Sequence, residues 1–87
     1  MHAVAVKVTI TDAEAGRAGL ERDVVPQTSQ APGFVAGYWM DAGDNQGRAI
    51  LVFESEDAAR AAAEQVQGRA DAVTLDSVDV WEVVASA

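Results

Sequence analysis

One stretch, residues 32–54, constrains the fold of this chain more than any other. Two apolar segments, 34–41 and 48–54, flank residues 42–47, which are rich in Gly, Asp and Asn. Apolar, β-branched and aromatic segments separated by turn-forming residues are typical of a β-hairpin. The pair Pro32-Gly33 predicts a turn ahead of it. We therefore expect two strands joined by a loop of about six residues.

Both faces of this hairpin are predicted to be covered. Alternation along the first strand places Phe34, Ala36, Tyr38 and Met40 on one face, and Val35, Gly37, Trp39 and Asp41 on the other. Each face thus carries a large aromatic ring. The second strand has a continuous apolar run over 49–53, which favours burial on both sides. A two-layer monomer covers only one side of its sheet.

A strand and a helix are predicted ahead of the hairpin. Residues 3–10 alternate, and the more apolar face carries Val4, Val6, Val8 and Ile10. Thr11 and Glu14 have the spacing of a capping box, so a helix is expected from about residue 12. Its apolar stripe is Ala13, Gly16, Leu20 and Val24. Pro26 is expected to kink or end this helix near Val25, followed by a polar lead over 27–31.

A second helix and a final strand are predicted after the hairpin. Ser55 is placed to cap the helix, and Gly68 to end it. The buried stripe of this helix is expected to be Ala59, Ala62, Ala63 and Val66. The residue pattern predicts extended strands over 73–75 and 78–84. The apolar residues of the two segments do not follow one continuous alternation, which predicts a bulge near Asp76-Ser77.

The resulting order, β-α-β-β-α-β in 87 residues, predicts one domain, residues 1–87. Short connections and the handedness of crossovers favour a ferredoxin-like α+β sandwich with a four-stranded antiparallel sheet and both helices on one face. The second face of that sheet would leave aromatic side chains in water. Packing two copies face to face removes this exposure, so we expect a homodimer that forms an α/β barrel.

Charge and composition exclude several classes of function. The net charge is −8, and no cluster of basic residues offsets it, which argues against nucleic-acid binding. No stretch approaches the roughly 20 apolar residues of a membrane span, and no signal peptide is evident. The chain has no cysteine, so thiolate chemistry is excluded and a cytoplasmic location is expected. Asp41, Asp44 and Asn45 lack the spacing of a metal loop and are interpreted as a solvated turn; no metal site is expected.

The segments APGFVAGYW (31–39) and VFESEDAARAA (52–62) give the chain a family resemblance. It resembles the dimeric α/β-barrel superfamily, which includes the antibiotic-biosynthesis monooxygenase-like domains, and within it small proteins of high-GC actinobacterial type. The resemblance implies a fold that hosts monooxygenases, haem-degrading enzymes, isomerases and binding proteins. Haem-binding members generally carry a helical His as iron ligand, whereas the single histidine here is His2, at the chain start, interpreted as an exposed strand-end residue. We expect no cofactor.

Four residues are the candidates for ligand binding: Tyr38, Trp39, Arg48 and Trp81. The resemblance implies a cavity for a flat phenolic molecule, in which the tryptophans form apolar walls, Arg48 supplies a cation and Tyr38 a hydroxyl. Tyr38 and Trp39 point to opposite sides of one strand, so only one of them can face such a cavity. The plainer alternative is that the rings fill the core or the dimer interface, and that Arg48 pairs with Asp41 or Asp44.

Two functions follow from these residues. The first is a homodimer that binds a small apolar or aromatic molecule, with cofactor-independent, monooxygenase-like catalysis as its enzymatic form. The second is a non-catalytic dimerisation or regulatory module with a filled interface. A cavity of ligand size between the sheets would favour the first.

Overall fold

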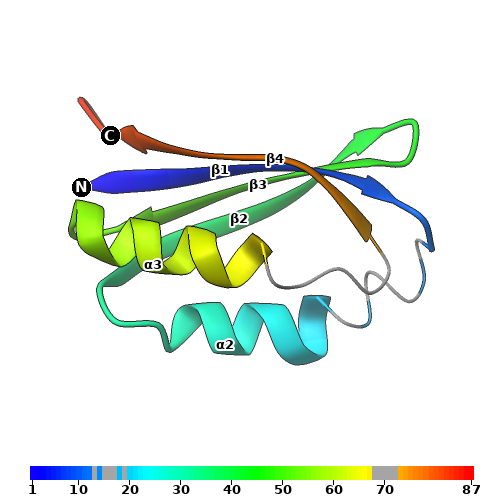
Figure 1. Cartoon of the computed structure of the whole chain (residues 1–87), viewed down its shortest axis with the longest axis horizontal. Coiled ribbons are helices and arrows are strands. Elements are labelled where there is room, and N and C mark those ends of the chain that lie inside the picture. Colours follow the sequence, from blue (N-terminus) through cyan, green and yellow to red (C-terminus); the bar gives the residue numbers. More distant parts are fainter. Residues whose placement is uncertain (13, 15–17, 19, 68–72) are drawn as a thin grey trace.

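The computed structural model describes residues 1–12, 14, 18, 20–67 and 73–87. Its elements are β1 (His2–Ile10), the π-helix η1 (Leu20–Val24), α2 (Val25–Ser29), β2 (Phe34–Gly43), β3 (Gln46–Phe53), α3 (Glu56–Gln67) and β4 (Val73–Glu82). The strands form one antiparallel sheet in the order β2-β3-β1-β4. Helices α2 and α3 lie on the same side of it (Figure 1). The predicted ferredoxin-like architecture is confirmed.

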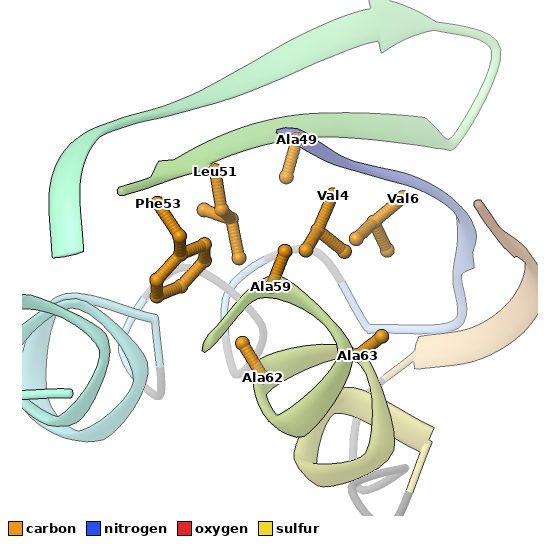
Figure 2. Packing of buried hydrophobic residues seen from close by; sticks show 8 residues of the cluster. All are labelled: Val4, Val6, Ala49, Leu51, Phe53, Ala59, Ala62 and Ala63. Carbon is orange, nitrogen blue, oxygen red and sulfur yellow. The ribbon is translucent and has the colours of Figure 1, made fainter. Parts of the chain in front are cut away.

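The hydrophobic core lies between the sheet and α3. Val4 and Phe53 are fully buried, and Leu51 is almost so. Figure 2 shows these side chains directed from β1 and β3 towards three alanines of α3: Ala59, Ala62 and Ala63. The predicted alanine stripe is therefore confirmed. Since alanine side chains are short, the helix can lie close to the sheet.

The start of α3 is capped as the sequence predicts. The Ser55 hydroxyl accepts a hydrogen bond from the backbone N–H of Ala58 at 3.2 Å, which satisfies a free donor of the first turn. The expected end at Gly68 lies outside the described residues.

The hairpin is tighter than predicted. Strands β2 and β3 continue to Gly43 and Gln46, and only Asp44 and Asn45 form the turn. Both turn residues have positive φ, 54° and 60°, as in the two-residue turns that match the twist of paired strands. The expected six-residue loop is wrong because Asp and Asn tolerate the left-handed conformation that a turn this short requires.

A bulge near the start of β2 changes which face Phe34 occupies. Phe34 is opposite Phe53, but the next pair is Ala36 opposite Val52, so Val35 is an extra residue. Phe34 therefore lies on the helix side, where its ring meets that of Phe53 edge to face with centroids 5.8 Å apart. The prediction that Phe34 shares a face with Tyr38 is wrong for this reason. The predicted turn at Pro32-Gly33 is present, with φ of 78° at Gly33.

The first helical segment does not end at Pro26. The π-helix η1 runs to Val24, and the α-helical α2 then continues to Ser29. Pro26 stands in the first turn of α2, directly after the π-helix. The expected helix end near Val25 is thus wrong, and residues 27–29 of the polar lead are helical. Two residues near the predicted start of this helix, Ala13 and Gly16, lie outside the described residues.

Strand β4 contains the predicted bulge. Ser77 is opposite Lys7 and Leu75 is opposite Val8, so Asp76 is the extra residue. The Asp76 carboxylate accepts a hydrogen bond from the Thr9 hydroxyl at 2.8 Å. The strand ends at Glu82, two residues earlier than expected, and Val84 is 87% exposed.

Replacement of Phe53 by Ala is expected to lower the free energy of unfolding by about 3–5 kcal/mol, because a fully buried ring leaves a cavity. Urea unfolding at one fixed protein concentration measures this. The control is Val84→Ala, which removes an exposed side chain. Equal midpoints for the two variants would contradict the position of Phe53 at the centre of the core.

The turn at Asp44-Asn45 gives a second test. Asn45→Ala should lower the free energy of unfolding by about 1 kcal/mol, because alanine is strained at positive φ. Asn45→Gly should not lower it, because glycine adopts this conformation freely. The same urea titration compares the two variants, and equal losses would show that the Asn45 side chain, rather than its backbone, stabilises the turn.

Candidate functional site

The side of the sheet away from α2 and α3, here called the open face, carries most of the candidate residues. The register places on it Ala36, Tyr38 and Met40 from β2, Gln46, Arg48, Ile50 and Val52 from β3, Ala3, Ala5, Lys7 and Thr9 from β1, and Thr74, Ser77, Asp79 and Trp81 from β4. No described helix covers this face (Figure 1).

Three of the four predicted ligand-binding residues share the open face. Tyr38 and Trp81 are 62% and 58% exposed, and Arg48 is half-buried. Arg48 is one row of the register from Tyr38 and two rows from Trp81. Tyr38 is on the edge strand β2 and Trp81 is on the opposite edge strand β4. Three strand spacings of about 4.8 Å separate them, so the two rings flank the face rather than touch each other.

Trp39 lies on the other side of the sheet. It is half-buried and packs against the hydrophobic core. Its ring covers Gly37 so closely that a Cβ there would lie 2.9 Å from the Trp39 Cη2 atom, which explains the glycine at this position. Trp39 is therefore a core residue, and of the pair Tyr38 and Trp39 only Tyr38 is on the open face.

The sequence suggested that Arg48 pairs with the acids of the hairpin, but it does not. Its guanidinium donates hydrogen bonds to the Gly47 carbonyl at 2.9 Å and to Gln46 Oε1 at 2.8 Å. Asp41 is opposite Gly47 in the register, on the helix side, and accepts a hydrogen bond from the Gly43 N–H. Arg48 and Asp41 thus occupy opposite faces of the sheet.

Sequence reasoning missed two neighbours of Arg48. Met40 of β2 and Lys7 of β1 are its register partners on either side. Met40 is 47% exposed and Lys7 is exposed. The alternation of each strand shows which residues share a face, but the pairing between strands depends on bulges, so no single-strand pattern reveals this row of side chains.

His2 is not the exposed residue that the sequence suggested. It is half-buried, and its Nδ1 atom is buried without a hydrogen-bond partner among the described residues. It lies on the helix side near Glu56, whose pKa is lowered chiefly by a 2.8 Å hydrogen bond from Arg60, then by the charge of Arg60, and to a small extent by His2. These groups are remote from the open face.

A small cavity lies on the helix side, between the first helical segment, α3 and β3. Its volume is about 30 Å³, and it is lined by Val24, Gln27, Thr28, Ala31, Leu51, Ala62, Gln65 and Val66. This is room for a water molecule, whereas ligand pockets measure about 300–1,000 Å³. Within the described residues no cluster of three His, Cys, Asp or Glu side chains forms a metal site. None of the described helices is both long and apolar enough to cross a membrane.

Comparison with known proteins identifies a related structure. No protein-family model matches the chain, and no curated protein sequence matches it. Among solved structures it is similar to the heme-degrader MhuD from Mycobacterium tuberculosis, determined with two hemes bound in its active site. The TM-score is 0.62 and the identity 22%, over 98% of each chain. The two proteins share a fold.

The helix side of this chain does not fit haem. Iron in haem proteins is held axially by His, Cys, Met or Tyr side chains. None of these residue types lines the helix-side cavity, the single histidine is His2, and cysteine is absent from the sequence. Tyr38 and Met40 are on the open face. The cavity is also far smaller than a porphyrin, so no chemistry through haem is derived for it.

Hemin titration tests this conclusion. The chain is expected to give no saturable change in Soret absorbance at equimolar hemin, whereas MhuD titrated in parallel should give one. A saturable change that persists in Tyr38→Phe would contradict the conclusion. A saturable change that is lost in Tyr38→Phe would identify the phenol as the iron ligand and would place the haem on the open face.

Proposed function

We propose that this protein is a homodimer in which the open faces of two sheets pack together and bind a small aromatic molecule between them. The first part of the proposal, dimerisation, rests on the solvent-exposed surface area of the chain. A folded monomer of 9.1 kDa exposes about 4,900 Å² by the usual scaling, but this chain exposes 5684 Å². The difference, about 800 Å², equals the share of one partner in a standard interface.

Three of the large hydrophobic side chains that are exposed lie on the open face. Tyr38, Met40 and Trp81 are all about half or more exposed, and all three belong to it. Large apolar patches on soluble proteins are typical of interaction sites. Because α2 and α3 already cover the opposite side of the sheet, a second copy has this face available.

The charge distribution also favours a second copy. The chain carries a net charge of −8, so two copies repel each other over most of their surface. On the open face, however, Lys7 and Arg48 are balanced by Asp79 and by Asp76, which bonds to Thr9 there. A face with no net charge can meet its own copy around a two-fold axis without this repulsion.

The size of the side chains supports a ligand site between the two faces. The central strand β1 presents Ala3 and Ala5, while the edge strands present the much larger Tyr38 and Trp81. Two such surfaces meet first at their edges and leave space above the alanines. Aromatic walls with few polar groups are typical of small-molecule sites. MhuD binds hemes, and its fold therefore accommodates aromatic molecules.

The second candidate is a dimerisation or regulatory module without a ligand. It is favoured by the small helix-side cavity and by the length of Tyr38, Met40 and Trp81, which can reach across a two-fold interface and fill it. The enzymatic form of the first candidate, a cofactor-independent oxygenase, would consume dissolved oxygen in the presence of a phenolic substrate.

Dimerisation is tested by sedimentation at micromolar concentration. The wild-type chain is expected to be a dimer, and Tyr38→Ala combined with Trp81→Ala is expected to shift it towards a folded monomer, because both rings leave the interface. Trp39→Ala is the matched control: it should remain dimeric but unfold at a lower urea concentration, since Trp39 packs on the core. A wild-type monomer would contradict the proposal.

Ligand binding separates the two candidates. Small aromatic molecules such as naphthalene derivatives are expected to change the fluorescence of Trp81 in the dimer, and to do so equally in a Trp39→Phe background, where Trp81 is the remaining tryptophan. A dimer that shows neither a fluorescence change nor a thermal shift with any of them would be the module with a filled interface.

A further inference from the structure

Two positive charges stand side by side on the open face. Lys7 of β1 and Arg48 of β3 are direct register partners, and these are the two inner strands of the sheet. They are two of only six basic residues in the chain. Adjacent like charges on paired strands are destabilising, so the arrangement invites an anionic partner.

Among the described residues neither cation has an ion-pair partner: Asp76 and Asp79 offset the two charges on the open face but form no ion pair with them. The ion pairs among the described residues are Arg22 with Asp23 and Arg60 with Glu56. The Arg48 guanidinium bonds only to the uncharged groups of Gln46 and Gly47. Covering the open face would remove water from both cations, which is costly unless an anion compensates.

We propose that the ligand of the open face is an aromatic carboxylate, whose carboxylate group is bound by Arg48 and Lys7 together. This rests on the proposed dimer with a ligand between its faces. The planar guanidinium of Arg48 matches a carboxylate with two parallel hydrogen bonds. The Lys7 ammonium supplies a second charge from the adjacent strand.

The register also gives the position of the ring. The next row of side chains along the strands is Tyr38, Ile50, Ala5 and Asp79. It lies about 7 Å from the row of the two cations, since residues two apart in a strand are separated by about 6.8 Å. An aromatic ring attached to the carboxylate would thus lie over Ile50 and Ala5, beside Tyr38. Asp79 lies at the far end of the row, which disfavours a second negative group there.

The test compares two ligands of the same shape, 1-naphthoate and neutral 1-naphthamide, by fluorescence titration of the dimer. The wild-type protein is expected to bind the carboxylate about 10- to 100-fold more tightly, as charge-assisted hydrogen bonds predict. The variant Lys7→Gln with Arg48→Gln, made together with Asp76→Asn and Asp79→Asn so that the open face stays without net charge, should lose this preference and remain dimeric by sedimentation. The control is Arg22→Gln with Arg60→Gln, which removes two positive charges away from the open face and should keep the preference.

Each contrary outcome has its own meaning. A dimer that binds both ligands equally, or binds only the amide, would overturn the carboxylate assignment and leave the proposed function standing. Dissociation of the variant with the neutral open face, in the absence of ligand, would show that these cations pair with carboxylates of the second copy, such as Asp79, and would also overturn it. A wild-type monomer would remove the proposed function, and this inference with it.

Discussion

The packing of one side of the sheet against a helix faced with alanine is the interaction on which the rest of this structure depends. Phe53, Leu51 and Val4 supply the bulk of the core, and α3 contributes mainly alanine methyl groups to it. Such a core is thin, and none of the described helices covers the other side of the sheet. The open face is therefore a direct consequence of how the core is built.

The open face acquires its chemistry from strand pairing rather than from any local motif. Lys7 and Arg48 are 41 positions apart in the sequence, yet the register places them opposite each other. The same pairing puts alanines in the centre and aromatic rings at both edges. A neutral, partly apolar surface results on a protein that is otherwise acidic, and this combination is the basis for proposing both a dimer and an anionic ligand.

The likeness to MhuD illustrates how far a shared fold extends. The two chains correspond over 98% of their lengths, but at 22% identity the fold alone is shared. In this chain the cavity between the first helical segment, α3 and β3 has room for a water molecule and is lined by residues that do not bind iron. The ligand site that we propose is on the opposite side of the sheet.

The sequence by itself determined the order of elements, the capping of α3 by Ser55, the alanine stripe and the bulge near Asp76, because each depends on side-chain period or on hydrogen bonds within a few residues. It predicted Tyr38, Arg48 and Trp81 as candidates, and separated Tyr38 from Trp39 by alternation alone. Only the tertiary structure decided three further features. The hairpin turn consists of the two residues Asp44-Asn45, Phe34 lies on the helix side of the sheet, and the neighbour of Arg48 in the strand register is Lys7, while Asp41 is on the opposite face. These depend on backbone conformation at single residues and on strand register, where one extra residue moves a side chain to the opposite face of the sheet.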